Sequence, residues 1–303
     1  MASQADLPRK TRELMNHHLD SRVWNAFPFR PNDVIVATYP KSGTTWMQQI
    51  VLQILSKGKL EIPLHTISPW LDSRIGMERH LAMLSGQKHR RFIKSHLPLN
   101  ALQYRPRPKY IYVARDGRDA CFSLYNHLAN ATDFYFNMYN NMPGRIGPPL
   151  MRPGPEVRDF FRQWLADSDR PDSSYWEHIR SWWDGRNVPN IMLVHYADLK
   201  RDLDGQLRRI ASFLGNVVPD EAWPVIADHC SFDYMKSHAN LFIEAPELIF
   251  KGGAQAVINK GFNGRWRDVL TSEDIAAYEQ TARAQLSEEC VAWLANGAGA
   301  SKA

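Results

Sequence analysis

The stretch TYPKSGTTWMQQI, residues 38–50, decides the fold because it joins an apolar strand to a helix through a polar turn. The residues that lead into it, VIVAT at 34–38, are apolar and mostly β-branched, which favours a strand buried on both faces. From Trp46 onward apolar residues recur every three to four positions, as is typical of a helix. We therefore predict a strand, a tight turn and a helix start.

The turn itself carries groups that suit an anion. The first backbone N–H groups of a helix are unpaired and lie at the positive end of its dipole. Lys41 adds a charge, and Gly43 permits close approach of the backbone to an oxygen. Further donors come from the hydroxyls of Ser42, Thr44 and Thr45. We expect phosphate or sulfate here; the alternative is that Ser42 or Thr44 only caps the helix.

The order of residues in this turn separates it from the nucleotide P-loop. In G-x-x-x-x-G-K-[ST] the lysine follows the last glycine, whereas here Lys41 precedes Gly43 and residues 36–42 contain no glycine. An ordinary ATPase or kinase loop is therefore disfavoured. Residues 39–46, YPKSGTTW, match letter for letter the run that the cytosolic sulfotransferases carry in their 5′-phosphosulfate loop. The chain resembles that family.

Length and composition favour one large α/β domain, because 303 residues with 44% hydrophobic and 23% charged side chains can bury a full core. We expect a single domain over 1–303 with an N-terminal extension at about 1–30. The net charge of +5 favours acidic ligands. Basic residues are scattered among acidic ones, however, and nucleic acid is not an expected partner.

The cysteines and the apolar stretches indicate the compartment. Cys121, Cys230 and Cys290 are far apart and lack C-x-x-C spacing, which disfavours a disulfide framework or a zinc site and suits a reducing cytosol. The N-terminus lacks the apolar core of a signal peptide, and no stretch reaches about 18 uninterrupted apolar residues. We expect a cytoplasmic protein without stable membrane insertion.

Strands and helices are expected to alternate along the chain. Further strands are predicted at 91–94, 109–114 and 191–196. Helices are predicted at 76–84, 119–130, 156–165, 175–186, 203–214, 220–229 and 278–294. Right-handed crossovers then give an α/β fold: a P-loop-like parallel sheet flanked by helices on both faces, with ligands beyond the carboxyl ends of the strands.

Segment 131–155 breaks this alternation and is rich in aromatic residues, Met, Asn, Gly and Pro. A loop of this length is usually functional or disordered, and its aromatic content argues against disorder. We interpret it as a lid over an apolar acceptor pocket, with a packed surface excursion as the alternative. The last residues, 297–303, are expected to form a disordered tail.

Lys94 and His96 follow the second predicted strand, where such sheets carry active residues. Alternate residues of an extended chain point to one side, so the two side chains share a cleft. A lone histidine is more often a structural residue than a catalytic base, and this chain has eleven histidines. Residues 94–98, KSHLP, nevertheless resemble the Lys-x-His-Leu-Pro run of sulfotransferases, whose histidine is the general base. By that resemblance His96 takes a proton from an acceptor hydroxyl.

The reaction that this resemblance implies needs positive charge. Negative charge lies on the sulfuryl oxygens and grows on the leaving phosphate, and cations fixed nearby stabilise that transition state. We expect Lys41 near the leaving oxygen and Lys94 near the sulfuryl oxygens. These lysines and the helix start do the task that magnesium does in phosphoryl transfer, so no metal is expected.

The spacing of Arg115 and Ser123, eight residues, matches the family's element for the 3′-phosphate of 3′-phosphoadenosine 5′-phosphosulfate (PAPS). Arginine suits this task because its planar fork makes two charge-assisted bonds to phosphate. The alternative is that Arg115 pairs with Asp116 in an ordinary turn. The reaction product would be 3′-phosphoadenosine 5′-phosphate (PAP).

Other positions resemble the residues that hold adenine. Trp46 and Phe232 correspond to the pair that sandwiches the base, and Tyr196 to the tyrosine that hydrogen-bonds it. Cys230 stands in the same element, where the family usually has threonine. We therefore expect these four residues to contact the donor.

NKGFNGRWR at 259–267 resembles the family's Arg-Lys-Gly-x-x-Gly-Asp-Trp-Lys loop, which holds the 3′-phosphate. This assigns Asn259, Lys260 and Gly261 to donor binding, with Asn259 where the family usually has arginine. Losing one charged phosphate contact costs about 1.5–3 kcal/mol. The family's dimerisation motif is not recognisable in 268–280, so the oligomeric state is left open.

The resemblance covers about 33–271 and implies a PAPS-dependent sulfotransferase acting on a hydroxyl of a small apolar, phenolic or lipid-like acceptor. TISPWLD at 66–72 and HYADL at 195–199 resemble bacterial members in particular. Two other functional classes remain as alternatives: a non-catalytic binder of 3′-phosphoadenosine nucleotides and a nucleotide kinase on a P-loop scaffold. The presence of both Lys94 and His96 argues against the binder, and a reaction without magnesium would exclude the kinase.

Overall fold

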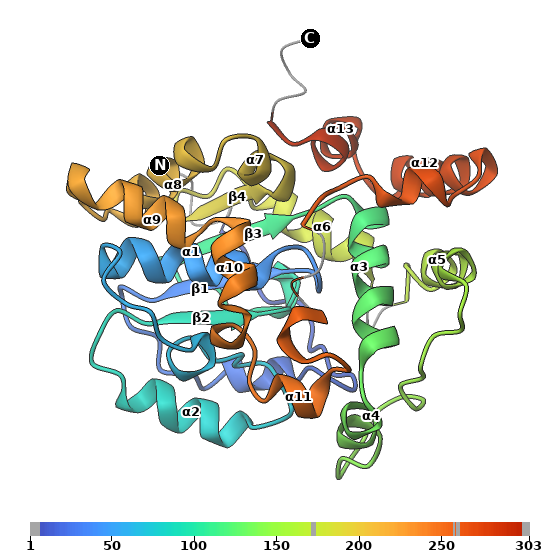
Figure 1. Ribbon diagram of the computed structural model, residues 1–303, viewed down its shortest axis with the longest axis horizontal. Coiled ribbons are helices and arrows are strands. Elements are labelled where there is room, and N and C mark those ends of the chain that lie inside the picture. Colours follow the sequence, from blue (N-terminus) through green and yellow to red (C-terminus); the bar gives the residue numbers. More distant parts are fainter. Residues whose placement is uncertain (1–6, 171–173, 257, 259–260, 299–303) are drawn as a thin grey trace.

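One parallel sheet organises the computed structural model, which describes residues 7–170, 174–256, 258 and 261–298 (Figure 1). The strand order is β2-β1-β3-β4. The strands are β1 Val34–Thr38, β2 Phe92–Ser95, β3 Lys109–Ala114 and β4 Ile191–His195. The α-helices are α1 Thr44–Ser56, α2 Met77–Gly86, α3 Gly117–Asn130, α4 Asp133–Asn140, α5 Val157–Ala166, α6 Tyr175–Asp184, α7 Tyr196–Arg201, α8 Leu203–Leu214, α9 Trp223–His229, α10 Phe232–Ser237, α11 Pro246–Ile249, α12 Ser272–Gln285 and α13 Glu288–Asn296.

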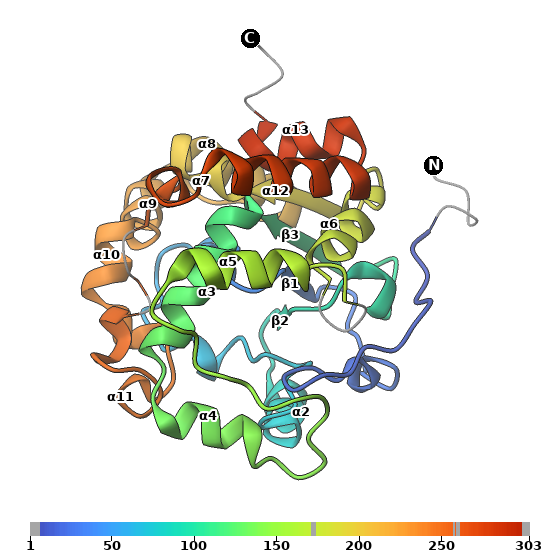
Figure 2. The same ribbon diagram turned by 90° about the vertical axis from the view of Figure 1, so that its right-hand side faces the viewer.

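Both faces of the sheet are buried, which explains the continuous apolar run of β1. Val34 and Val36 point into a core shared with α1, α8 and α9. Ile35 and Ala37 point into a second core shared with α5, α6, α12 and α13. Figures 1 and 2 show the strands between these two groups of helices. The expected α/β fold, with a parallel sheet flanked by helices on both faces, is confirmed.

The amino ends of β1 and β2 are joined by an ion pair. Arg91 Nη2 lies 2.6 Å from Asp33 Oδ2, and each side chain is only 1% exposed. A second guanidinium nitrogen, Nε, donates to Asp33 Oδ1 at 2.8 Å. Such a bidentate pair fixes the geometry of both strand starts. The opposite, carboxyl ends of the strands are left for the loops that carry Lys41 and His96.

The sequence interpretation of a single helix at 278–294 is wrong. Figure 1 shows α12 and α13 as two helices. Helix α12 begins earlier, at Ser272, because the Thr271 and Asp274 side chains form a reciprocal capping box. The chain is extended at Leu286, and Ser287 caps a new helix by accepting from the Cys290 N–H. The serine followed by two glutamates is a start signal that overrides the apolar periodicity.

Segment 131–155 is not the continuous loop that its composition suggested. Its first part is helix α4, because Thr132 Oγ1 accepts from the Tyr135 N–H and Asp133 lies in the first turn. Tyr135 and Tyr139 of α4 are buried against Leu128 at the end of α3. Figure 2 shows the remaining stretch running from α4 to α5. Whether this segment moves as a lid stays a prediction.

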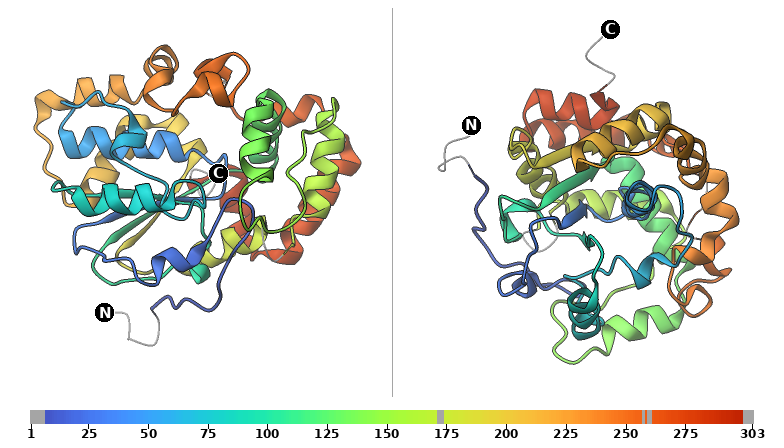
Figure 3. Two further views of the ribbon diagram at one scale, coloured as in Figure 1. Left: turned by 90° about the horizontal axis from the view of Figure 1, so that it is seen from below. Right: turned by 90° about the vertical axis from the view of Figure 1, so that its left-hand side faces the viewer.

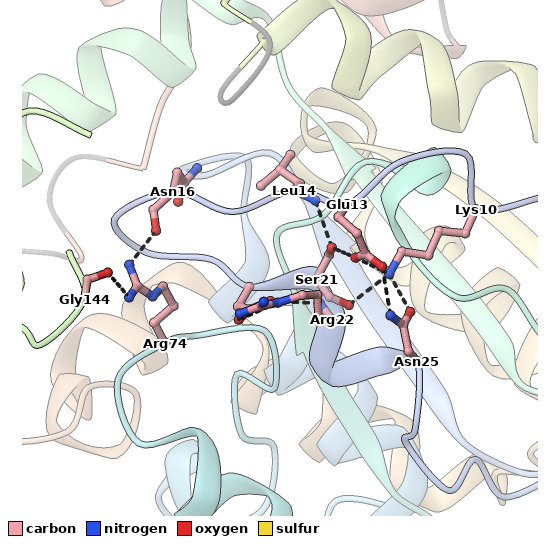
Figure 4. A network of polar contacts seen from close by, with 10 residues as sticks. Lys10, Glu13, Leu14, Asn16, Ser21, Arg22, Asn25, Arg74 and Gly144 are labelled. Carbon is pink, nitrogen blue, oxygen red and sulfur yellow. Dashed lines mark hydrogen bonds and ion pairs between the residues drawn. The ribbon is translucent and has the colours of Figure 1, made fainter. Parts of the chain in front are cut away.

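The segment expected as an N-terminal extension packs into the core of the sheet from residue 7 onward. Leu14 and Trp24 belong to the same buried cluster as Ile35. Arg74 ties this segment to the stretch after α4, because its guanidinium donates to the carbonyl oxygens of Asn16 at 3.2 Å and of Gly144 at 2.6 Å (Figure 4). Figure 3 shows the N-terminal segment, in blue, running beside the chain near α2.

The expected disordered tail, 297–303, is described only for its first two residues. These are held in place, because the Ala298 N–H donates to Asp198 Oδ2 at 3.0 Å and the Gly297 N–H to the Trp293 carbonyl oxygen at 2.7 Å. Residues 299–303 lie outside the described part. Among the described helices, none is both long and apolar enough to cross a membrane.

Candidate active site

The strand order brings the two most polar loops together. From β1 the chain goes to β2 on one side and later to β3 on the other, so the carboxyl ends of β1 and β3 form a switch point, where such sheets bind ligands. Lys41 follows β1 and Arg115 follows β3. Arg115 Nη1 donates to the Lys41 carbonyl oxygen at 3.3 Å. Both side chains line one large cavity.

The turn between β1 and α1 has the backbone of an anion cradle. Gly43, the N-cap of α1, has φ of 105°, and Lys41 has φ of 69°. A Cβ at Gly43 would lie 2.8 Å from Tyr196 Cδ2, so only glycine fits without displacement. The first turn of α1 contains no acidic residue. The cavity is lined here by Lys41, Gly43, Thr44, Thr45 and Trp46.

Ser42 differs from its neighbours. Its side chain is fully buried and is not among the residues that line the cavity. Its Oγ has no hydrogen-bond partner among the described residues. Thr44, by contrast, faces the cavity, and its Oγ1 lies 2.6 Å from Thr38 Oγ1. The Ser42 side chain therefore does not face the cavity, where the sequence predicted a donor, and leaving a buried hydroxyl unsatisfied costs about 1–3 kcal/mol.

Three cations, Lys41, Lys94 and Arg115, converge on the cavity. Burial, together with the charges of Lys94 and Arg115, lowers the pKa of Lys41 to about 7. Burial lowers the pKa of Lys94 to about 8. Among the described residues, none of the three forms an ion pair with Asp or Glu. Mutual repulsion of this kind is relieved by a multiply charged anion, so the residues fit a ligand that carries phosphate and sulfate.

His96 stands directly after β2 and lines the cavity. Its Nδ1 lies 2.8 Å from the carbonyl oxygen of Thr38. Because a carbonyl oxygen only accepts, Nδ1 carries the proton, and Nε2 keeps a free lone pair. Burial and the nearby charge of Lys94 hold the pKa of His96 well below its usual value. A neutral imidazole with a free nitrogen is the form that a general base requires.

Asp72 supports the loop of His96 and was missed by the sequence analysis. One of its oxygens, Oδ2, accepts from the His96 N–H at 3.0 Å and from Trp70 Nε1 at 2.9 Å, and Oδ1 accepts from Trp24 Nε1 at 3.2 Å. The Trp70 ring stands edge-on to the His96 ring. Lys94 Nζ lies 4.5 Å from the centroid of the Trp70 ring. The motif at 66–72 contains Asp72, but nothing in its spacing indicates this contact.

His178 is a second supporting residue outside the sequence motifs. Its Nε2 lies 3.2 Å from the His96 carbonyl oxygen, and its Nδ1 lies 2.9 Å from the Tyr112 hydroxyl. Nε2 therefore donates to His96 and Nδ1 accepts from Tyr112. Burial lowers the pKa of His178 to about 3, so it stays neutral. The contact with the carbonyl oxygen holds the backbone of His96 in place.

Three aromatic residues gather where adenine was expected. The rings of Trp46 and Tyr196 lie 5.3 Å apart, and both residues line the cavity with Phe232. Tyr196 begins α7 rather than ending β4. Cys230 contributes differently from the expectation: its side chain is buried and does not line the cavity, while its carbonyl oxygen accepts from Trp46 Nε1 at 2.7 Å.

The region expected to hold the 3′-phosphate is partly described. Arg115 and Ser123 both line the cavity, and Arg115 Nε donates to Asn263 Oδ1 at 3.1 Å. The alternative, in which Arg115 pairs with Asp116, is absent among the described contacts, where Asp116 Oδ2 instead lies 2.6 Å from Arg118 Nη2. Gly261 also lines the cavity. Asn259 and Lys260 lie outside the described residues.

The whole cavity has a volume of about 870 Å³, and aromatic and aliphatic side chains line much of the rest of its wall. Helix α4 contributes Tyr135, Met138 and Tyr139, and the N-terminal segment contributes Leu14 and Leu19. This apolar part adjoins His96 and Lys94 and suits an apolar small molecule. The described residues contain no group of three or more His, Cys, Asp or Glu side chains arranged to hold a metal ion.

The chain is similar to known sulfotransferases over most of its length. The sulfotransferase domain family matches residues 31–289. A glycolipid sulfotransferase of Mycobacterium bovis (strain BCG / Pasteur 1173P2) is 30% identical over 301 residues, covering 92% of each chain. Sulfotransferase 1A1 of Rattus norvegicus is 30% identical over 250 residues, covering 80% of each.

Solved structures share the fold. A retinol dehydratase in complex with retinol and PAP superimposes with a TM-score of 0.67 at 25% identity, covering 88% of this chain and 84% of that one. A mouse sulfotransferase complexed with PAP gives a TM-score of 0.66 at 23% identity, covering 89% and 90%. The family match over most of the chain defines the class of protein as a transferase. The chain belongs to the sulfotransferase family.

Proposed function

We propose that this sulfotransferase moves the sulfuryl group in line from PAPS to a hydroxyl of a small apolar, phenolic or lipid-like acceptor, with His96 as general base. The observation that carries the proposal is the Nδ1 contact of His96 with Thr38, which leaves Nε2 without a hydrogen-bond partner among the described residues, in a cavity that Lys41 and Lys94 also line. Bound PAPS supplies an activated sulfuryl group, whose S–O bond to phosphate breaks as the bond to the acceptor oxygen forms.

His96 takes the acceptor proton at Nε2 and becomes an imidazolium. Its Nδ1–H keeps the bond to the Thr38 carbonyl oxygen, which stabilises the positive charge that develops on the ring. The backbone contacts from Asp72 and His178 hold the ring in place during this change. General base catalysis of this kind typically contributes about 10²- to 10⁴-fold in rate.

Lys41 and Lys94 stabilise the negative charge that moves during transfer. Lys41, in the turn before α1, is assigned to the oxygen that leaves with PAP, and Lys94 to the sulfuryl oxygens. A nearby anion raises the pKa of each lysine from its lowered value, so both become fully charged when the donor is bound. The N–H groups at the start of α1 add fixed dipoles directed at the same charge.

Donor selectivity is assigned to the part of the cavity that Arg115 and Ser123 line. Arg115 and Ser123 are proposed to bind the 3′-phosphate, with Gly261 and, from the sequence alone, Asn259 and Lys260. The base is proposed to lie between Trp46 and Phe232, near Tyr196. The apolar wall from α4 and the N-terminal segment is proposed to hold the acceptor. Relatives named glycolipid sulfotransferases make lipid-like acceptors the first class to test.

The test uses sulfur-labelled PAPS and a panel of phenols, steroids, alkyl alcohols and glycolipids. The full chain should label at least one class without added magnesium. His96→Ala should lower turnover by about 10²- to 10⁴-fold while PAP affinity changes less than about threefold. A parallel loss of turnover and PAP affinity in this variant would show that His96 is structural, and the base would have to be sought elsewhere.

A further inference from the structure

A second histidine contacts the donor-loop lysine. Lys41 Nζ lies 3.1 Å from His127 Nδ1. When Lys41 is protonated, its ammonium group only donates hydrogen bonds, so Nδ1 of His127 is then unprotonated and accepts. The other nitrogen, Nε2, then carries the proton and points to the Tyr135 hydroxyl at 3.4 Å. One imidazole thus links the β1–α1 turn to helix α4.

The surroundings of His127 hold its ring in this orientation. His127 lies four residues after Ser123 on α3, so the two side chains share one helix face, and both line the cavity. The ring packs edge-on against Tyr135, at 5.5 Å between centroids, and against Phe250, at 4.8 Å. An aromatic residue without nitrogen would fill the same space. The nitrogen facing Lys41 is therefore not needed for packing.

Lys41 needs such a partner because its environment disfavours its charge. It is buried, and Lys94 and Arg115 add positive charge nearby. His127 itself stays neutral, because burial and the charge of Lys41 hold its pKa well below the usual value. The titratable and charged groups that interact with this pair from the surrounding elements are His18, Lys94, His96, Arg115 and Tyr135. Asp119 and Tyr196 line the same cavity.

We propose that His127 is a positioning residue for Lys41: its unprotonated Nδ1 accepts from Nζ, keeps the side chain protonated and directs it across the cavity before the donor arrives. This inference rests on the proposed role of Lys41 in donor binding. An ammonium group has three donors, so the contact with His127 leaves two for donor oxygens. Without this hydrogen-bond acceptor, the flexible side chain of Lys41 adopts other conformations, and its protonated form is less stable.

The test is the affinity for PAP as a function of pH, measured calorimetrically from pH 6 to 9.5. Hydrogen bonds to charged groups are strong enough to shift a pKa by about one unit. His127→Phe keeps the aromatic packing and removes the acceptor, so the decline of affinity at alkaline pH should begin about one unit lower than in the unaltered protein, with similar affinity at pH 6. His127→Gln supplies an acceptor oxygen and should restore most of the shift.

Tyr135→Phe is the matched control, because it removes the partner of Nε2 and leaves Nδ1 in place. Its affinity curve should follow that of the unaltered protein; a shift equal to that of His127→Phe would assign the effect to the packing of the cluster and overturn the proposal. Coincident curves for the unaltered protein and His127→Phe would also overturn it. Absence of PAP binding to the unaltered protein at every pH would instead refute the proposed function.

A measurement on the unaltered protein covers the case in which His127→Phe does not fold. Nitrogen NMR of labelled histidine distinguishes the two neutral tautomers. His127 should remain neutral between pH 6 and 8, with the proton on Nε2. A proton on Nδ1 would exclude the contact with the Lys41 ammonium and with it the proposal.

Discussion

The Thr38 carbonyl oxygen accepts from Nδ1 of His96 at 2.8 Å, although 58 residues separate the two along the chain. They meet because β1 and β2 are parallel neighbours whose carboxyl ends lie at one edge of the sheet. The contact sets the tautomer of His96 and leaves Nε2 for the cavity. The fold itself thus prepares the nitrogen that the proposed mechanism uses.

The pH dependence of kcat/KM for PAPS follows from the pKa values of the cavity. His96 stays neutral well below pH 6.5, because its pKa is lowered, so activity should not fall between pH 7 and 6. Lys41 and Lys94, with pKa values near 7 and 8, lose their charge as pH rises, so kcat/KM should decline through pH 7–9. The measurement uses an aliphatic alcohol as the sulfuryl acceptor, so that ionisation of the acceptor hydroxyl does not contribute to the pH profile. An acid limb centred near pH 6.5 would contradict the assignment of His96.

Arg115→Ala should weaken binding of PAP by about 10- to 150-fold, because a charge-assisted contact to phosphate contributes about 1.5–3 kcal/mol. Adenosine 5′-phosphosulfate lacks the 3′-phosphate and serves as the control ligand, whose affinity should change little. Calorimetric titration of both ligands measures the difference. If the two affinities fall by the same factor, Arg115 acts on the whole site rather than on the 3′-phosphate.

Gly43→Ala should lower the free energy of unfolding by more than about 1–2 kcal/mol. A left-handed backbone conformation alone costs alanine about that much, and the added Cβ would also lie 2.8 Å from Tyr196 Cδ2. PAP affinity should fall at least about tenfold as the turn and Tyr196 move. Gly215→Ala is the matched control: φ is +66° and no atom lies within 4 Å of the position that the added methyl group would take. It should lose stability but keep PAP affinity, and loss of affinity in both variants would refute a local effect.

Arg91→Met should destabilise the fold by about 3–5 kcal/mol, because it leaves Asp33 buried and unpaired. Urea unfolding measures this loss as a lower midpoint. The pair lies at the amino ends of β1 and β2, away from the cavity, so PAP affinity below the unfolding range should stay within about twofold. Adding Asp33→Asn to the Arg91→Met variant should recover part of the lost stability. No recovery would indicate that the loss comes from the packing of the arginine side chain.

Local patterns along the chain predicted the sheet and indicated many of the polar and aromatic residues that line the cavity. The apolar run before Lys41 and the glycine-containing turn after it indicated β1, the turn and α1. The match of residues 39–46 to a known run then indicated the donor. These signals are local, because strand burial, turn geometry and helix start depend on neighbouring residues. Parallel packing of the strands then brings Lys41, Lys94 and Arg115 to one cavity.

Contacts between distant segments were beyond this reasoning. Asp72 reaches His96 across 24 residues, and His127 reaches Lys41 across 86. Neither has a distinctive spacing, since side-chain contacts of this kind depend on the packed tertiary structure. The helix break at Ser287 had a local signal, a serine followed by acidic residues, which the apolar periodicity concealed.

The most direct test of the account is a crystal structure of the protein with PAP. The 5′-phosphate should lie at the start of α1, within hydrogen-bond distance of Lys41 Nζ and of the N–H groups of Gly43, Thr44 and Thr45, with His96 Nε2 facing the open end of the cavity. A 5′-phosphate bound away from this turn, or a His96 ring with Nε2 directed at Thr38, would contradict it.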